Sequence, residues 1–539
     1  MTPHNLTPRL LLTLPLLLAL PACGDSGADA YGDDGGNYDS SATNPSGGDD
    51  DGEDGGGGLG VGQGGSQDFG QFKEILENGE IPGPNTIDDV GFFNEHKIEL
   101  PAPECADDVC LHGLFGQMGN MISGSDCITV LVGMNTPIDI ADYPRPPLNL
   151  SLVIDTSGSM QGAPIDYARQ GLERMLDGLE PGDSVHLVTF STTAHIQVEA
   201  LGGDDPELIN AIAAIVADGG TNIYDGLRTG FELVDAHYTE GAQNRVVLLS
   251  DGQATQGITN NAQIIEMAAA YAGLGYGLTT IGVGTDFDVD LMRTLSEQAS
   301  GSFYFLEDPA AVKEVFHEEV TSFLVPLASD VKLGVDIGGA YLLRGIYGTK
   351  LFDFSSGQGT IDIPNLQLAH REDVDDHDDG GRRGGGGAIL LELLRKPGQA
   401  ASKEVGDLKL HYRIPGTEQF VDQEVQIQVP VDPGDVDLEH GTFDHVSVQK
   451  GFVMLNIYMA FQMAATRAQQ GDWDGAWNVL YAVDANVAGW LQAHPDFDVE
   501  DDLNYVRLFR GNIEAKRAQQ NPNAPVPSPA PAPEPWPYD

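Results

Sequence analysis

The chain has 539 residues, of which 82 are Asp or Glu and 27 are Lys or Arg, so its formal net charge is −55. This shortage of basic residues excludes the basic surface on which nucleic-acid binding depends, and nucleic acid is not an expected partner. The length is too great for one hydrophobic core and predicts about three domains, while a hydrophobic content of 41% is that of an ordinary globular protein.

Residues 1–23 have the pattern of an export signal. Arg9 precedes the apolar run LLLTLPLLLAL at 10–20, which is too short to span a membrane as a stable helix. The run ends in LPAC, with Leu three positions before Cys23 and a small residue directly before it. This resembles the lipobox of bacterial lipoproteins, which implies that Cys23 is acylated and anchors the protein to a membrane of the bacterial cell envelope, the outer membrane being favoured. Simple secretion after cleavage nearby, to the periplasm or the cell surface, is the alternative.

Composition divides the part of the chain that follows. Residues 24–70 are nearly all Gly, Asp, Ser and Asn, and we expect a disordered acidic tether because they offer too little apolar surface to bury. Residues 71–145 are poorly periodic and predict loops and a few short elements, apart from a strand at 127–134. We expect that strand to pair with the strands predicted at 326–435.

Three cysteines, Cys105, Cys110 and Cys127, remain after Cys23. In an oxidising compartment Cys105 and Cys110 are candidates for a disulfide that closes a small loop, with Cys127 buried or unpaired. Metal binding by the three is the alternative, but no His lies at the spacing of a zinc finger.

From 146 to 325 strand and helix patterns alternate. Apolar runs predict strands, among them LNLSLVID at 148–155 and NRVVLLS at 244–250, and the second has four continuous apolar residues, as a strand buried on both faces does. Apolar residues at helical spacing predict the intervening helices, as in APIDYARQGLERMLDGL. Such alternation is typical of the α/β class with a doubly wound, mostly parallel sheet.

The remaining residues predict two further regions. Period-two patterns at 326–435 indicate an antiparallel β-sandwich, whose acidic insert at 371–387 does not match an EF-hand calcium loop. Residues 436–520 return to helical spacing around a QQGDWDGA turn and predict a helical hairpin region with its Met, Trp and Tyr residues in the core. A Pro-rich tail at 521–539 is expected to be disordered.

Oxygen-bearing side chains follow the predicted strands of the α/β region. Asp155 ends one strand and begins an Asp-x-Ser-x-Ser motif with Ser157 and Ser159; Asp251 follows another strand, and Thr221 lies in a Gly-Gly-Thr-Asn loop before a helix. Because ligands of an open parallel sheet bind outside the carboxyl ends of its strands, we expect these residues to converge. Their oxygens suit Mg²⁺, Mn²⁺ or Ca²⁺ rather than zinc, which prefers His and Cys.

The segments LNLSLVIDTSGSM, GGTNIYDGL and RVVLLSDGQ occur in this order and, within residues 146–325, closely resemble the von Willebrand factor type A (VWA) domain with its metal-ion-dependent adhesion site (MIDAS). The resemblance implies that Ser157, Ser159 and Thr221 coordinate a divalent cation directly. Asp155 and Asp251 act directly or through water. It also implies a protein partner whose Asp or Glu completes the coordination. The flanking strands suggest that this domain is inserted into the sandwich, as in integrins and some bacterial adhesins.

The expected function is binding rather than catalysis: a membrane-anchored extracytoplasmic binding or adhesion protein of the bacterial VWA lipoprotein type. The alternative is a metal-dependent hydrolase, or an accessory factor of the assembly or chelatase type. Against an enzyme, FHEEV at 316–320 lacks the second His of the H-E-x-x-H motif, and neither a P-loop nor a G-x-S-x-G elbow occurs. We expect His186 and His195 to be core or surface residues rather than a catalytic base.

Overall fold

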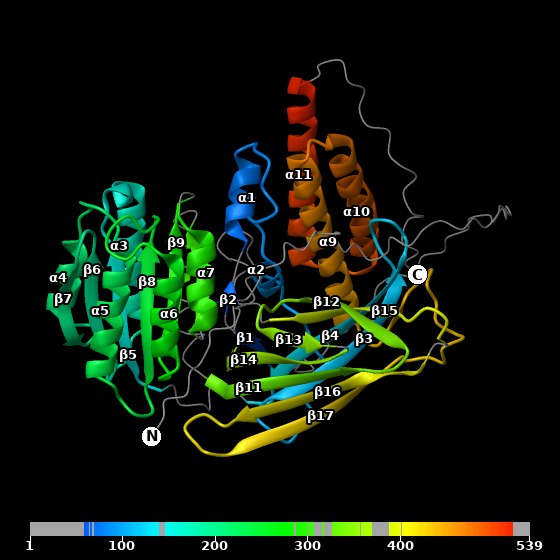
Figure 1. Cartoon of the computed structure of the whole chain (residues 1–539), viewed down its shortest axis with the longest axis horizontal. Helices are drawn as coiled ribbons and strands as arrows, with labels where there is room; N and C mark the ends of the chain where they lie inside the picture. Colours follow the sequence, from blue (N-terminus) through cyan, green and yellow to red (C-terminus); the bar gives the residue numbers. More distant parts are fainter. Residues whose placement is uncertain are drawn as a thin grey trace, which may run out of the picture.

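The computed structural model describes residues 59–63, 65–66, 69–138, 146–284, 287–299, 301–306, 315–316, 326–355, 357–368, 387–399 and 402–520. They form two parts: an α/β domain, residues 148–306, and a body built from the segments on either side of it, residues 59–136 and 326–520 (Figure 1). The predicted signal at 1–23, most of the insert at 371–387 and the tail at 521–539 lie outside the described residues.

The α/β domain contains a seven-stranded sheet with helices on both faces. Its own elements are β5 (Leu148–Asp155), α3 (Ala163–Asp177), β6 (Ser184–Phe190), β7 (Ala194–Leu201), α4 (Pro206–Ala213), α5 (Ile223–Ala236), β8 (Gln243–Ser250), α6 (Asn261–Ala272), β9 (Gly277–Val283), α7 (Val289–Gln298) and β10 (Ser302–Leu306). The strand order is β2-β10-β9-β8-β5-β6-β7, and only the pairing of β7 with β6 is antiparallel. The edge strand β2 (Gly65–Ser66) comes from the N-terminal segment of the body. The predicted doubly wound fold is confirmed.

The central strand β5 shows why this sheet forms. All of its residues are buried, and successive side chains enter different cores. Leu152 and Ile154 pack in the core under α3 and α4, whereas Val153 packs in the core under α5, α6 and α7. A parallel sheet covered on both faces needs such a continuous apolar run. Because the faces are covered, a ligand reaches the strands only at their ends.

The body contains an eleven-stranded antiparallel sheet that folds over on itself. Its strands are β1 (Leu59–Gln63), β3 (Cys110–Gly119), β4 (Asp126–Thr136), β11 (Pro326–Ile337), β12 (Tyr341–Tyr347), β13 (Phe352–Ser355), β14 (Gln358–Leu368), β15 (Ile389–Arg395), β16 (Glu404–Arg413), β17 (Phe420–Gln428) and β18 (Thr442–Phe443). Strand β1 pairs with β4 on one side and with β14 on the other, which joins the two halves. Val130 and Leu391 of one half share a core with Leu333 and Leu408 of the other, so the halves face each other as the predicted sandwich.

The α/β domain is an insertion into this sheet. Strand β4 pairs with β15, from Ile128 opposite Leu393 to Val132 opposite Ile389, which confirms the pairing predicted for 127–134. The chain leaves the sheet after Thr136 and re-enters it at Pro326. Both ends of the α/β domain therefore connect to strands of the same sheet.

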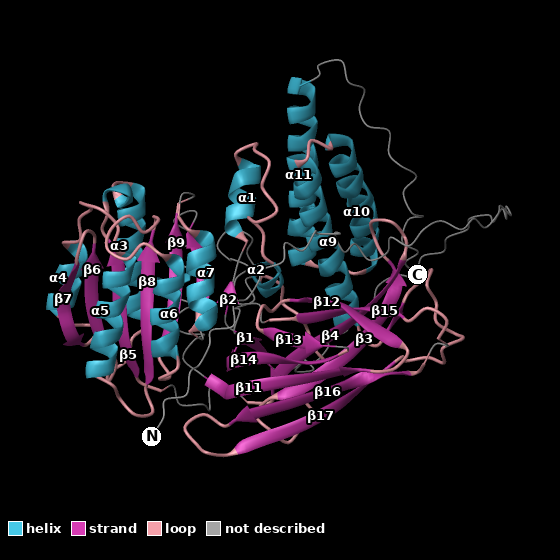
Figure 2. Cartoon of the chain, viewed as in Figure 1, coloured by secondary structure: helices cyan, strands magenta, loops and turns pink. Residues whose placement is uncertain are grey.

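Helices cover one side of the body sheet, as Figure 2 shows. They are α1 (Gly70–Glu77), α2 (Asp89–Asn94), α9 (Val446–Gln469), α10 (Trp473–Ala493) and α11 (Phe497–Gln520). The C-terminal region thus has a third long helix beyond the predicted hairpin. Helix α11 is rich in charged residues, but Val499, Leu503, Val506 and Phe509 recur at helical spacing and are buried against the other two helices.

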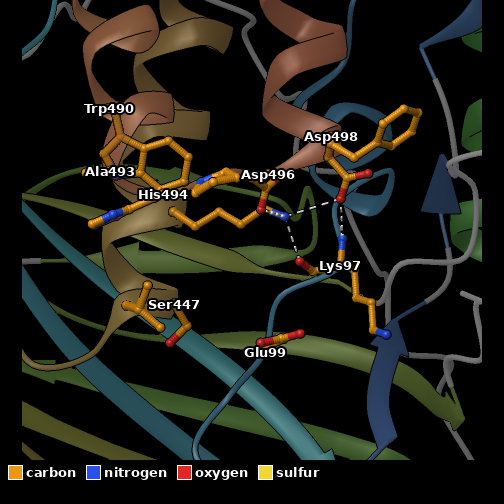
Figure 3. A pocket seen from close by; sticks show the side chains of 12 residues that line it. Lys97, Glu99, Ser447, Trp490, Ala493, His494, Asp496 and Asp498 are labelled. Carbon is orange, nitrogen blue, oxygen red and sulfur yellow. Dashed lines mark hydrogen bonds and ion pairs between the residues drawn. The ribbon is translucent and has the colours of Figure 1, made fainter. Parts of the chain in front are cut away.

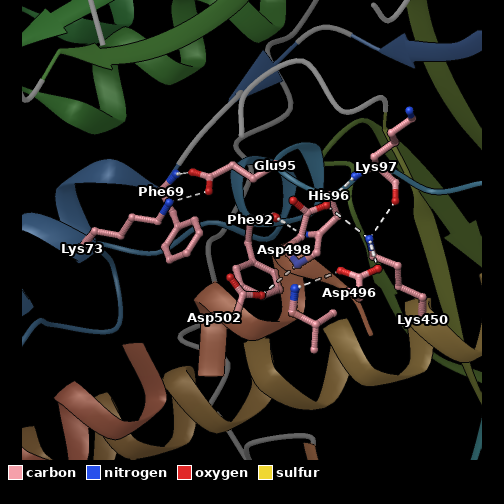
Figure 4. Close-up of polar contacts among 11 residues, drawn as sticks. Phe69, Lys73, Phe92, Glu95, His96, Lys97, Lys450, Asp496, Asp498 and Asp502 are labelled. Atoms are coloured by element: carbon pink, nitrogen blue, oxygen red, sulfur yellow. Dashed lines mark hydrogen bonds and ion pairs between the residues drawn. The ribbon is translucent and has the colours of Figure 1, made fainter. Parts of the chain in front are cut away.

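Ion pairs and hydrogen bonds fasten the N-terminal segment to the C-terminal helices (Figure 4). The ammonium of Lys450 lies 2.7 Å from the Asp496 carboxylate and donates to the carbonyl oxygen of Lys97 at 2.8 Å. His96 Nε2 lies 2.8 Å from Asp502 Oδ2, and both side chains are fully buried. Residues 69–97 consequently form one unit with α9 and α11, although some 400 residues separate them in sequence.

The structure bears on three further expectations from the sequence: the tether, the cysteines and a membrane span. The prediction of a disordered tether is wrong for residues 59–63 and 65–66, because β1 and β2 lie there and Val61 is buried between the halves of the body sheet, and residues 24–58 lie outside the described residues. Cys105 and Cys110 form a disulfide, and Cys127 is buried. Among the helices that the structure describes, none has the length and apolarity that crossing a membrane requires.

Candidate functional site

The five predicted oxygen donors lie at the carboxyl edge of the α/β sheet. Asp155 is the last residue of β5, and Asp251 directly follows β8, the neighbouring strand. Ser159 lies in a single 3₁₀ turn, Gly158–Met160, between β5 and α3. Thr221 precedes Asn222, which caps the N-terminus of α5. Three loops from separate parts of the domain therefore meet at one edge.

Hydrogen bonds connect these side chains into one cluster. Asp155 Oδ1 accepts the backbone N–H of Ser157 at 2.8 Å, and the hydroxyl oxygens of Ser157 and Ser159 lie 3.0 Å apart. Ser159 in turn donates to Asp251 Oδ1 at 2.9 Å. A Cβ atom added at Gly252 would lie 3.5 Å from Thr221 Oγ1 and 3.7 Å from Ser159 Oγ. The structure therefore brings all five residues together.

Burial and charge distinguish the base of the cluster from its mouth. Asp155, Ser157, Thr221 and Asp251 are buried, whereas Ser159 is exposed. Burial, with a smaller contribution from the nearby charge of Asp251, raises the pKa of the Asp155 carboxyl to about 6 against the effect of its hydrogen bonds. Two carboxylates thus share a poorly solvated space that opens to solvent at Ser159.

The donor set fits a hard divalent cation. Every predicted donor is a carboxylate or hydroxyl oxygen, which Mg²⁺ and Ca²⁺ prefer, and the net negative charge of the cluster favours any cation. Among the described residues no group of three or more His, Cys, Asp or Glu side chains is placed to hold a metal, so this cluster depends on its hydroxyls.

Two further residues support the cluster and were not predicted from the sequence. The Ser250 hydroxyl donates to Asp155 Oδ2, the oxygen that Ser157 does not contact. The Thr255 hydroxyl accepts the backbone N–H of Thr221 at 3.0 Å, and the Thr255 N–H donates to the Thr221 carbonyl at 2.9 Å. Ser250 was discoverable from its place directly before Asp251 at the end of a strand. Nothing in the sequence around Thr255 indicates which loop it contacts.

His186 and His195, two histidines of this domain, have the places that the sequence predicts. His186 is fully buried, and its Nδ1 accepts the N–H of Ala200 while its Nε2 lies 3.0 Å from Asn149 Oδ1. Burial lowers the pKa of His186 to about 4, and the neighbouring His237 contributes. His195 is exposed on the edge strand β7. Neither lies in the cluster.

The body contains a pocket of about 520 Å³, which is a second candidate for a binding site (Figure 3). Lys97, Glu99, Lys450, Trp490, His494 and Asp498 are among the residues that line it. The three donors of the Lys450 ammonium already meet Asp496, Asp498 and a backbone carbonyl, at 2.7, 3.2 and 2.8 Å. His494 is similarly engaged with Gln449 at 3.0 Å. The central polar groups of this pocket therefore include a cation that the protein itself supplies, which the five donors at the edge of the α/β sheet do not.

Comparison with known proteins identifies the α/β domain. Residues 149–318 match the family model of the von Willebrand factor type A domain. Uncharacterized protein YfbK from Escherichia coli is 26% identical over 200 residues, which are 36% of this chain and 35% of that protein. Human inter-alpha-trypsin inhibitor heavy chain H4 is 32% identical over 191 residues, 33% of this chain and 20% of that protein. The chain thus matches between a fifth and about a third of the length of these relatives.

Two solved structures resemble more of the chain. A von Willebrand factor type A protein from Catenulispora acidiphila covers 75% of this chain and 96% of its own, with a TM-score of 0.47 and 14% identity. The ArnB paralog VWA2 from Sulfolobus acidocaldarius covers 76% of this chain and 98% of its own, with a TM-score of 0.41 and 15% identity.

Proposed function

Because residues 149–318 form a von Willebrand factor type A domain, a kind of domain that commonly mediates protein–protein interaction, we propose that the chain binds a protein ligand through a divalent cation at the carboxyl edge of this sheet. The observation that supports the proposal is the convergence of two carboxylates and three hydroxyls from three loops at an edge that opens to solvent. Mg²⁺ is the proposed cation, with Ca²⁺ or Mn²⁺ as the other cations that such donors suit.

The proposed site contains neutral and charged oxygen donors, which have different roles. Ser157, Ser159 and Thr221 offer hydroxyl oxygens, which hold a cation without cancelling its charge. Asp155 supplies negative charge from a fixed position, because the Ser157 N–H and the Ser250 hydroxyl each hold one of its oxygens. A divalent cation bound here keeps residual positive charge and attracts a carboxylate of the partner protein. Ser159, at the exposed mouth, marks the side from which the partner approaches.

We further propose a binding role without catalysis, performed outside the cytoplasm by a protein anchored through acylated Cys23 to the cell envelope, the outer membrane being favoured. The export pattern at 1–23 supports the location, and so does the Cys105–Cys110 disulfide, because disulfides persist in oxidising compartments. A Cys23→Ser precursor is expected to lose the form that partitions into detergent. Unchanged partitioning of the variant would remove the anchor from this proposal.

The experiment that tests the metal-bridged contact begins with peptide display on the full chain in Mg²⁺. An Asp- or Glu-bearing peptide selected in this way is compared with its amide counterpart, in which only the carboxylate becomes Asn or Gln. We expect binding of the acidic peptide to be lost in EDTA, in the Asp155→Ala chain and in the amide peptide. The Asp290→Ala chain, which removes an exposed carboxylate of α7, is the matched control and should bind normally.

The outcomes separate the proposed site from other surfaces. Binding that persists in EDTA and in Asp155→Ala means that a different surface makes the contact. Equal binding of the acidic and amide peptides contradicts the carboxylate bridge even if the metal is required.

A further inference from the structure

A cluster of five charged side chains lies where the α/β domain meets the body. Arg293 and Glu297 come from α7, Asp88 and Asp89 from the start of α2, and Lys350 from the loop between β12 and β13. Helix α7 also contacts β2, and Figure 1 shows it on the side of the domain that faces α2 and β2. The cluster therefore joins three elements that are distant in sequence.

Asp88 connects the two parts directly. Its Oδ2 lies 3.5 Å from Arg293 Nη1, in the α/β domain, and 3.5 Å from Lys350 Nζ, in the body. Its other carboxylate oxygen caps the N-terminus of α2. Asp89 forms an ion pair with Lys350 and accepts the N–H of Gly348 at 2.6 Å. The side chains of Asp88 and Asp89 are only 6% and 3% exposed, whereas that of Lys350 is 42% exposed, so the carboxylates are buried and solvent reaches the cluster from the Lys350 side.

Glu297 is the member of this cluster whose charge is not balanced. Its Oε1 is buried and has no hydrogen-bond partner in the described structure. With Glu297 ionised, three carboxylates face the two cations Arg293 and Lys350; with Glu297 protonated, the charges are equal. A buried charge left without a partner is costly, so the ionised form opposes the docking of the two parts.

Little backbone pairing holds the domain at this junction. Strand β2 pairs with β10 through two residue pairs, Gly65 with Ser302 and Ser66 with Phe303. The side chain of Asn94 in α2 donates to the Ser66 carbonyl at 2.7 Å and ties this short strand to the body. The charged cluster therefore lies beside a short strand pairing, where a change in its charge can shift the docking of the two parts.

We propose that this cluster is a latch between the α/β domain and the body, and that protonation of Glu297 strengthens it. The proposal is independent of the metal site, which lies at the ends of β5 and β8. Besides Arg293 on its own helix, the charged groups that act on Glu297 are Asp88 and Asp89 of α2 and Lys350 of the β12–β13 loop. Tyr458 of α9, whose pKa burial raises, completes the titratable surroundings of Asp88 and Asp89.

The sign of the pH dependence follows from proton binding. Burial raises the pKa of Glu297 to about 7 from its ordinary value of 4.5, and the charge of Asp88 adds to the rise. The docked state therefore binds more protons than the undocked state between these two values, and docking weakens as the pH rises through them. Between pH 5.5 and pH 7.5 the equilibrium constant for undocking is expected to increase about twentyfold.

Hydrogen exchange of the full chain measures this equilibrium. Undocking breaks the pairing of β2 with β10, so peptides that cover Gly65–Ser66 and Ser302–Leu306 report it. Protection factors, which correct for the intrinsic rate at each pH, should fall about twentyfold from pH 5.5 to pH 7.5. Glu297→Gln mimics the protonated carboxyl, and its protection should be high and equal at both pH values. Glu266→Gln, at an exposed position of α6, is the matched control and should behave as the unmodified chain.

A second variant keeps the test decisive if Glu297→Gln does not fold. Lys350→Ala leaves Glu297 in place but removes one of the two cations, so the protection of the β2 and β10 peptides should be lower at both pH values. Protection that does not change with pH in the unmodified chain overturns the proposal. A pH dependence that persists unchanged in Glu297→Gln overturns it as well, because some other group then supplies the proton.

Discussion

Two buried polar clusters in this chain differ in how their charges are balanced. In the body, Lys450 meets the carboxylates of Asp496 and Asp498 at 2.7 and 3.2 Å, so the protein supplies its own cation. At the edge of the α/β sheet, Asp155 has hydroxyl and N–H partners, and the nearby charge that raises its pKa is the like charge of Asp251. A cluster that contains its own cation holds segments together, whereas one without a cation suits a cation from solution.

The largest expected effect tests the body cluster, which contains its own cation. Lys450→Met keeps a long side chain but leaves Asp496 and Asp498 facing each other without a cation, and breaking a buried ion pair from one side costs about 3–5 kcal/mol of unfolding free energy. Urea unfolding followed by tryptophan fluorescence measures it, because Trp473, Trp477 and Trp490 all lie in α10 of the body.

The control for this change is Lys403→Met. The Lys403 side chain is 49% exposed, and its ion pair with Asp432 spans 3.7 Å, so its loss is expected to cost no more than about 0.5 kcal/mol. Similar losses in the two variants would show that Lys450 is not the cation that holds the body cluster together.

The next effect tests the cluster at the edge of the α/β sheet, which has no cation of its own. At a hundredfold excess over its dissociation constant, Mg²⁺ should stabilise the α/β domain by about 2.7 kcal/mol through mass action alone. Asp155→Ala should remain folded without metal and should lose this increment, whereas Asp290→Ala should retain it. Thermal unfolding followed by circular dichroism, with and without Mg²⁺, gives the comparison. An increment that survives in Asp155→Ala would place the cation elsewhere.

Some elements of the fold were predictable from the sequence, and others were not. The alternation in 146–325 was predictable because each strand there carries its own apolar run, as β5 does. Strands β1 and β2 were not predictable, because LGVGQGGS has the composition of a disordered tether. These residues form strands only because strands of the two sheets pair with them. The charged helix α11 was not predicted as a separate element for a related reason. Its apolar stripe is narrow, and it forms part of a core only when it packs against α9 and α10.

Part of the candidate site was likewise predictable from the sequence, and part was not. Asp155 and Asp251 were predicted to converge because parallel strands end at a common edge, which a linear sequence reveals. The contact of Thr255 with Thr221 depends on which loops lie opposite each other across that edge, and this is a property of the folded domain. The latch residues Asp88, Arg293 and Lys350 were likewise beyond prediction, because they come from three distant segments.

A smaller effect is expected at His186, a buried titratable group that is neutral in the folded domain. The pKa of His186 is lowered by burial from 6.5 to about 4, so the unfolded chain binds a proton that the folded domain excludes. Its contribution to stability is complete well above pH 6.5 and is lost as the pH falls toward 4, and by pH 5 the loss is about 2 kcal/mol. Unfolding of His186→Gln should lack this part of the acid sensitivity, whereas the exposed control His411→Gln should retain it.

The smallest expected effect concerns the loop that carries Thr221. The Thr255 hydroxyl accepts the Thr221 N–H at 3.0 Å, while the Thr255 N–H holds the Thr221 carbonyl at 2.9 Å. Thr255→Val keeps the shape and the backbone contact but removes the hydroxyl acceptor, so Thr221 is held less firmly beside the other donors. Loss of such a supporting hydrogen bond is expected to weaken Mg²⁺ binding about tenfold, which is about 1.4 kcal/mol. Isothermal titration with Mg²⁺ measures the change, and Thr255→Ser, which keeps the hydroxyl, should restore the affinity. If Thr255→Val and Thr255→Ser bind Mg²⁺ equally well, the loop is positioned by its backbone alone, and the hydroxyl has no part in the cluster at the edge of the α/β sheet.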